Sequence, residues 1–292
     1  MAELPEQTYP RPQYGRWLTG PFTFIALLIV ARFLLEFFRM PHSLTRYLSS
    51  SGAIFLVALY LGAVAPLRGV IKSWNLVLPG ILLAAWTQGW VILFTLISGA
   101  FKIQQSHFAE PQDWGNWGHL GRHILEHLVE IAPTSVIVLV LMAATLVLWR
   151  WPITVGPGAL LGALVVIRFW TEAMQLSPTA ASAWSSSVGF LLCGFYVGGV
   201  GPRLGISSAR QLLAPALVLG WAWRFWVFVA VLMNAAQPYY RTHFFNPANG
   251  HVVAHLARFF LGEVLVMGLI AGLVLWGIST WTLHALRSAA PA

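Results

Sequence analysis

The chain has 292 residues, of which 58% are hydrophobic and only 9% charged, and its formal net charge is +8. A soluble globular protein carries about 25% charged residues, so this composition excludes that class and indicates an integral membrane protein whose main partner is the lipid bilayer. The Lys and Arg residues are scattered along the chain and do not form one stripe, which argues against a nucleic-acid partner.

Apolar stretches long enough to cross a membrane recur along the whole chain. About 20 helical residues are needed to cross roughly 30 Å of hydrocarbon. We therefore expect an all-α, polytopic membrane protein with eight transmembrane helices. Their expected ranges, in chain order, are 21–38, 52–71, 76–100, 130–149, 153–174, 183–201, 211–235 and 260–283.

The first and the fifth predicted spans each carry an Arg and a Glu four residues apart. The pairs are Arg32 with Glu36 and Arg168 with Glu172. An ionisable side chain inside the bilayer is costly unless it faces a partner or a wet cavity, so each of these residues is a functional candidate. The same spacing also fits structural ion pairs along one helix face.

Two halves of the chain resemble each other. The segment ARFLLEFFRM (31–40) matches IRFWTEAMQL (167–176), and SHFAEP (106–111) matches THFFNP (242–247), both at a shift of 136 residues. Each half contains four predicted spans, so both copies enter the membrane from the same side and form parallel repeats. The expected organisation is an N-terminal tail at 1–20, a first four-helix repeat at 21–150 and a second at 151–287.

The basic residues favour one orientation in the membrane. Eight of them flank one side of the predicted spans and six flank the other. Under the positive-inside rule this bias places both termini in the cytoplasm, and we expect a protein of the bacterial inner membrane. In this orientation the histidine-rich segment before the fourth span lies at the extracytoplasmic face.

The segment GHLGRHILEHLVE (118–130) places titratable side chains on one helix face. Its three histidines and two glutamates fall within about 100° of arc at 100° per residue. Two imidazoles at positions i and i+4 suit one first-row metal ion, and carboxylates can complete the shell. The sequence thus predicts a site for iron, copper or zinc, or for a b-type haem. The candidate ligands are His119, His123, His127, His251, His255, Glu36, Glu172 and Glu130.

Tryptophans recur at helical spacing inside the third and seventh predicted spans. One interpretation is ordinary packing of aromatic rings against small residues. The alternative is a wall for a flat apolar ligand such as a quinone, a haem or a lipid tail. In that alternative Trp90 and Trp226 line the ligand and Arg224 holds its carboxylate, which makes these three residues candidates for cofactor binding.

Three functions fit these features. The first is a membrane metalloprotein or redox subunit that uses the His and Glu residues above. The second is a transporter or permease with a path between the two repeats, and the third is a non-catalytic scaffold subunit of a membrane complex. The motifs of nucleotide-binding loops, hydrolase elbows, zincin helices and c-type haem attachment are all missing from the sequence, so no catalytic residue is assigned.

Overall fold

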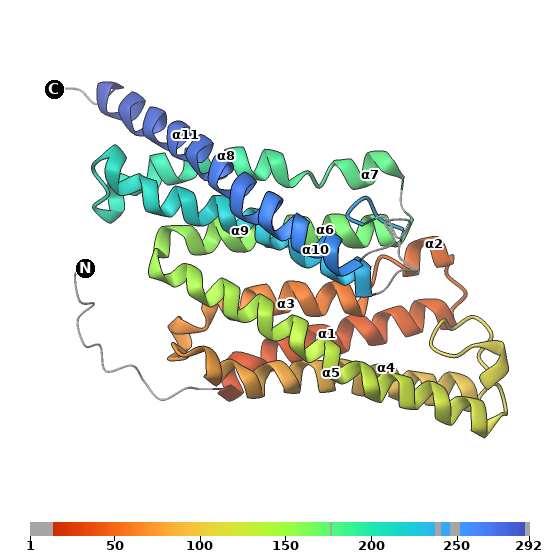
Figure 1. Ribbon diagram of the computed structural model, residues 1–292. Helices are drawn as coiled ribbons and strands as arrows, with labels where there is room; N and C mark the ends of the chain where they lie inside the picture. The colour runs from red at the N-terminus through yellow and green to blue at the C-terminus, as the bar shows by residue number, and fades with distance from the viewer. Residues whose placement is uncertain (1–13, 176, 237–240, 246–251, 290–292) are drawn as a thin grey trace. The chain divides into compact units, whose positions relative to one another are not determined.

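The computed structural model describes residues 14–175, 177–236, 241–245 and 252–289 (Figure 1). Two sequence predictions, the first part of the N-terminal tail (1–13) and the candidate ligand His251, lie outside these ranges. Every regular element in the described ranges is helical, so the all-α class is confirmed.

Seven stretches of helix in the described part of the chain are long and apolar enough to cross a membrane. The chain is therefore a multi-pass integral membrane protein. The principal helices of these stretches are α1 (Tyr14–Phe37), α4 (Val77–Ala100), α5 (Trp117–Val147), α6 (Val155–Ala173), α8 (Ser186–Val200), α9 (Ala209–Ala236) and α11 (Gly268–Ala289).

The predicted span at 52–71 corresponds to a shorter helix, α3 (Ser50–Val64). Its 15 residues extend about 22 Å at 1.5 Å per residue, which is less than the hydrocarbon thickness of about 30 Å. The helix ends just before Pro66, whose ring cannot continue a helical hydrogen-bond pattern. A 3-10 turn, η1 (Pro66–Arg68), follows and closes on Gly69 at a φ of 79°. Eight spans thus remain a prediction.

Helix α5 begins well before the predicted span at 130–149. It is continuous from Trp117 to Val147, with Pro133 inside it, and its 31 residues extend about 46 Å. The histidine-rich segment therefore lies on the same helix as the apolar span that follows it.

Short helical elements connect and extend the long helices. Two of them are α2 (His42–Thr45) and α7 (Pro178–Ser182). They end a few residues before α3 and α8 begin, respectively. A π-helical segment, η7 (Phe260–Met267), joins α10 (Val252–Phe259) to α11. The remaining 3-10 turns are η2 (Ser73–Leu76), η3 (Pro111–Asp113), η4 (Leu148–Arg150), η5 (Pro152–Thr154) and η6 (Gly201–Leu204).

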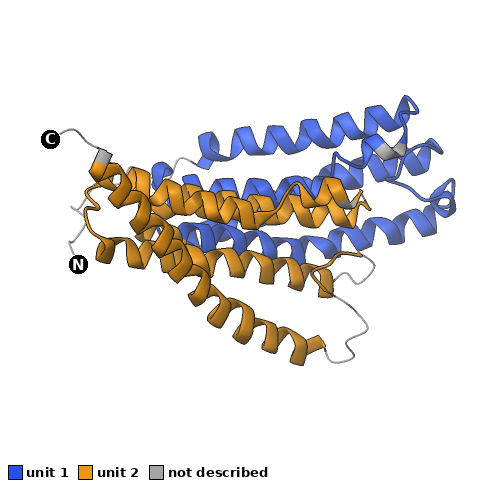
Figure 2. Ribbon diagram, turned by 90° about the horizontal axis from the view of Figure 1, so that it is seen from above, with its two compact units in different colours: residues 1–146 blue, residues 147–292 orange. Residues whose placement is uncertain are grey.

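The chain divides into two compact units, Met1–Leu146 and Val147–Ala292 (Figure 2). Within the first unit, α3 and α5 approach so closely that a Cβ atom on Gly62 would lie 2.5 Å from the carbonyl oxygen of Met142. Within the second unit, a Cβ on Gly198 would collide with the carbonyl oxygen of Ser279. Small residues at such crossings let two membrane helices make backbone contact.

Candidate functional site

A tight turn between α4 and α5 positions the carboxylate of Asp113 in the first unit. The backbone N–H of Glu110 donates to Oδ2 of Asp113 at 2.8 Å, and the N–H of Asp113 donates to the carbonyl oxygen of Glu110 at 2.9 Å. Gly115 follows with a φ of 75°, a conformation that glycine adopts without steric cost. The carboxylate of Asp113 is thereby held in one position, and Asp113 as a whole is only 2% exposed.

The first turn of α5 is capped by the residue just before it. Oδ1 of Asn116 accepts hydrogen bonds from the backbone N–H groups of Gly118 at 3.1 Å and His119 at 3.3 Å. A side-chain cap of this kind satisfies helix N–H groups that have no partner within the helix. It fixes the start of the helix that carries the histidines.

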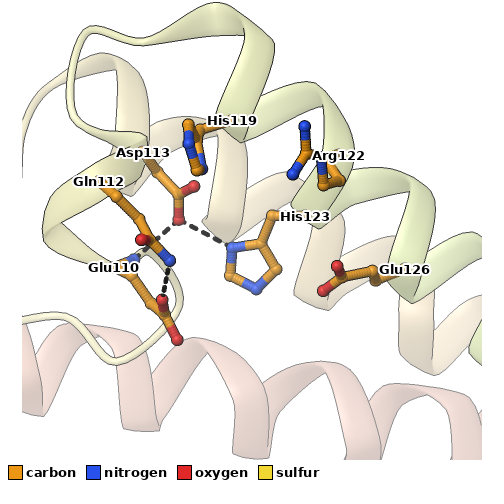
Figure 3. Close-up of a pocket in the computed structure, with 7 residues that line it drawn as sticks. All are labelled: Glu110, Gln112, Asp113, His119, Arg122, His123 and Glu126. Carbon is orange, nitrogen blue, oxygen red and sulfur yellow. Dashed lines mark hydrogen bonds and ion pairs between the residues drawn. The ribbon is translucent and has the colours of Figure 1, made fainter.

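Asp113 orients the ring of His123. The Nδ1 atom of His123 lies 2.8 Å from Oδ2 of Asp113. In the neutral imidazole, a proton on Nδ1 that is donated to the carboxylate leaves the lone pair on Nε2. The close-up view shows Nε2 turned away from Asp113, toward the space between Glu110 and Glu126 (Figure 3).

That space is a polar pocket of about 190 Å³. Two imidazoles and three carboxylates contribute to its lining, and Gln112 donates from Nε2 to the carboxylate of Glu110. Both Glu110 and Glu126 are exposed to solvent, so their side chains can change rotamer at little cost in packing. The full lining is Glu110, Gln112, Asp113, His119, Arg122, His123 and Glu126 (Figure 3).

The predicted ligand set is only partly gathered in this pocket. His119 and His123 both line it. The His127 ring is next to that of His123, with the centroids 4.9 Å apart, but its Nδ1 atom lies 3.1 Å from Glu130. In the described ranges, no group of three His, Cys, Asp or Glu side chains already has the arrangement of a metal site.

The Glu130 carboxylate is also tied to the neighbouring helix. Nε2 of Gln88, on α4, donates to Oε2 of Glu130 at 3.3 Å. In the second unit, Nη2 of Arg224 on α9 donates to Oε2 of Glu263 in η7. Both pairs join a long helix to a later helical segment of the same unit, which is the role of polar bridges between membrane helices.

Glu36 is engaged at the end of α1 and does not line the pocket. Its Oε1 accepts from Nε of Arg32 at 3.2 Å. Its Oε2 accepts from the backbone N–H of His107 at 3.1 Å and lies 2.7 Å from the Nδ1 of the same residue. The residue is 2% exposed, so it forms a buried link between α1 and the loop after α4.

Glu172 repeats these contacts within the second unit. It accepts from Nε of Arg168 at 3.1 Å and from the backbone N–H of His243 at 3.0 Å, and the Nδ1 of His243 lies 2.5 Å away. The residue after each histidine also makes the same contact in both units. The N–H of Phe108 donates to the hydroxyl of Ser106, and the N–H of Phe244 donates to the hydroxyl of Thr242, each at 3.2 Å. Each of these residues in the second unit lies 136 positions after its counterpart in the first unit.

The remaining candidates occupy different surroundings. His255 packs against the Phe245 ring, with the centroids 5.3 Å apart. Trp226 is 3% exposed and donates from Nε1 to the carbonyl oxygen of Gly158 at 2.9 Å.

Trp90, in the first unit, contacts the rings of Trp86 and Phe94. Trp223, and not Trp226, is the tryptophan that contacts the guanidinium of Arg224.

Several site residues were not among the sequence candidates. Asp113 and Glu110 come from the loop EPQD (110–113), where Pro at the first and Asp at the third position of the 3-10 turn η3 form a recognisable cap. His107 and His243 were visible as a duplicated His-Phe pair, but nothing local connects them to glutamates 71 residues earlier in the chain.

No protein-family model, curated protein or solved structure matches the chain.

Proposed function

We propose that the chain is a membrane metalloprotein whose first unit binds one first-row transition-metal ion, such as iron, copper or zinc, in the pocket beside Asp113. His119 and His123 supply the imidazole ligands. The observation that carries this proposal is the 2.8 Å contact between Asp113 and Nδ1 of His123, combined with the direction of Nε2 into the pocket (Figure 3). Metal-binding histidines usually donate their other ring N–H to such a carboxylate, which fixes the tautomer and the ring orientation.

The donor set of the pocket suits such an ion. Imidazole favours zinc, copper, iron and nickel, and carboxylates are common additional ligands. Glu110 and Glu126 line the same pocket, and a rotamer change in either brings an oxygen donor to the imidazoles. The cation Arg122 is also in the lining and favours an anionic or water ligand in a remaining position.

The size of the pocket favours an ion over a haem. Its volume is about 190 Å³, whereas pockets for organic ligands measure roughly 300–1,000 Å³. Its lining is also dominated by charged and polar side chains, which do not match the apolar faces of a porphyrin.

We further propose that the two units are parallel repeats of four spans each, with both termini in the cytoplasm of a bacterium and the pocket at the extracytoplasmic face. The matched contacts of Glu36 and Glu172 support this arrangement, as does the division of the chain after Leu146. The metal pocket belongs to the first repeat, and the second repeat has a supporting role.

The experiment is elemental analysis of the full chain, purified in detergent, incubated with a slight molar excess of each metal and then desalted. We expect one ion per chain in the wild type and in His284→Ala, a control that removes an exposed imidazole of the second unit. The double variant His119→Ala/His123→Ala should retain no ion. Equal metal content in the wild type and the double variant would exclude this pocket.

A permease is the second candidate, and one feature favours it. The breaks before α3 and α8 resemble the interrupted helices that form substrate sites in many secondary transporters. Reconstituted vesicles test this candidate. Metal-dependent or pH-dependent flux of a solute would support a transport function. Metal binding without flux would support the metalloprotein function and argue against a permease.

A further inference from the structure

The second unit contains an apolar pocket that the metal proposal does not use. Its volume is about 270 Å³, and it is lined by residues of α8, α9, η7 and α11. Phe190 and Trp223 stack with their ring centroids 4.4 Å apart. Nε1 of Trp223 donates to the hydroxyl of Ser186 at 3.0 Å, so this aromatic wall is held in place. Leu191, Ile270 and Val274 provide apolar surface along the remaining sides.

Arg224 places a cation in this pocket. It is the one charged residue among the described lining residues. Its guanidinium lies over the Trp223 ring at 4.9 Å from the centroid, and Nη2 donates to Glu263. The Nε–H is buried and has no hydrogen-bond partner in the described part of the chain. An unpaired buried donor is unfavourable, so the guanidinium retains capacity for an acceptor.

The amino-terminal end of α8 adds positive potential to the same place. The helix has 15 residues and begins at Ser186, and its second residue, Ser187, lines the pocket. The N-cap residue Ser185 makes no side-chain cap. In the first unit, by contrast, the matching Ser49 accepts from the N–H of Gly52 at 3.2 Å. Ser185 therefore does not cap the first N–H groups of α8, and a helix amino terminus without such a cap favours an anion.

We propose that this pocket binds the anion of a long-chain fatty acid, with the carboxylate at Arg224 and the first turn of α8 and the acyl chain along the apolar walls. The planar guanidinium fork matches a carboxylate. The volume of about 270 Å³ is just below the roughly 300–1,000 Å³ of pockets that enclose whole organic ligands, and it favours one chain over the two chains of a phospholipid. This site is independent of the metal pocket, because all of its residues belong to the second unit.

The first unit offers a built-in comparison. Gln88 stands 136 positions before Arg224 and bonds Glu130 as Arg224 bonds Glu263. A glutamine at this place therefore keeps a bridge to the neighbouring carboxylate while removing the cation. The substitution Arg224→Gln copies that arrangement into the second unit.

The experiment uses the full chain in nanodiscs of neutral phosphatidylcholine and a palmitic acid analogue with a photoreactive diazirine in its chain. We expect labelling of α8 or α11, competition by palmitate, and no competition by methyl palmitate. Affinity should fall about tenfold or more in Arg224→Gln, which removes the charge-assisted hydrogen bonds. It should also fall in Leu191→Trp, which fills the pocket.

The control Arg203→Gln, which changes an exposed arginine of the same unit, should bind palmitate as the wild type does. Thermal melting of each variant shows whether it is folded. Wild-type labelling in a folded Arg224→Gln or Leu191→Trp variant would overturn the proposal. Equal competition by methyl palmitate would also overturn it, as would displacement by phosphatidylglycerol and not by palmitate.

Discussion

The Nδ1 atom of His107 lies 2.7 Å from Oε2 of Glu36, and this contact ties the loop after α4 to the end of α1. The same carboxylate also accepts the backbone N–H of His107 and the Nε–H of Arg32. One nearly buried side chain thus satisfies three donors from two segments that are 71 residues apart. Because it serves both the helix and the loop, it contributes to the position of the polypeptide that continues to Asp113.

Replacing Glu36 with Ala should destabilise the protein by about 3 kcal/mol or more, because removing one member of a buried charged group leaves the others without compensation. Glu172→Ala should be milder, since the side chain of Glu172 is 15% exposed and that of Glu36 is 2% exposed. Thermal or denaturant unfolding in detergent measures both. A greater loss in Glu172→Ala, or no loss in either variant, would contradict the assigned roles.

The crossing of α3 and α5 should be sensitive to a single methyl group. Gly62→Ala places a Cβ against the backbone of Met142, so the helices must separate, at a cost of about 1–3 kcal/mol. Gly89→Ala is the matched control, because its Cβ would have no neighbour within 4 Å and the substitution raises helix propensity. Melting temperatures should fall for the first variant and stay equal or rise for the second.

Asp113→Asn should weaken metal binding without abolishing it. An amide cannot replace the charge of the carboxylate beside His123, and loss of such a partner typically lowers metal affinity 10–100-fold. Isothermal titration of the purified chain with Zn²⁺ provides the measurement. The stoichiometry should remain one ion per chain, and Glu110→Gln should show a smaller loss. An unchanged affinity in Asp113→Asn would remove this residue from the site.

The helical class and the approximate positions of the long helices were predictable from the sequence, because continuous apolar stretches are strong signals. The span at 52–71 was predicted too long, since hydropathy alone does not show where Pro66 ends α3. Periodicity also placed His119 and His123 on one face of a helix, and both line the pocket in the structure.

The partners of these residues were not predictable in the same way. Asp113 reaches His123 from a loop, and His107 reaches Glu36 across 71 positions. Side-chain contacts of this kind depend on how loops fold back on helices, which no local pattern encodes. The sequence also grouped Glu36 with His119 as ligands, whereas Glu36 bonds His107 and Arg32.

X-ray absorption spectroscopy of the Zn²⁺-loaded, detergent-purified chain tests the central claim most directly. We predict two imidazole nitrogens at about 2.0–2.1 Å and oxygen donors in the remaining positions of a roughly tetrahedral shell. The imidazole signal should disappear in His119→Ala/His123→Ala and persist in His255→Ala. A shell of oxygen atoms alone in the wild-type protein, or an imidazole signal that survives the double substitution, would contradict the assignment.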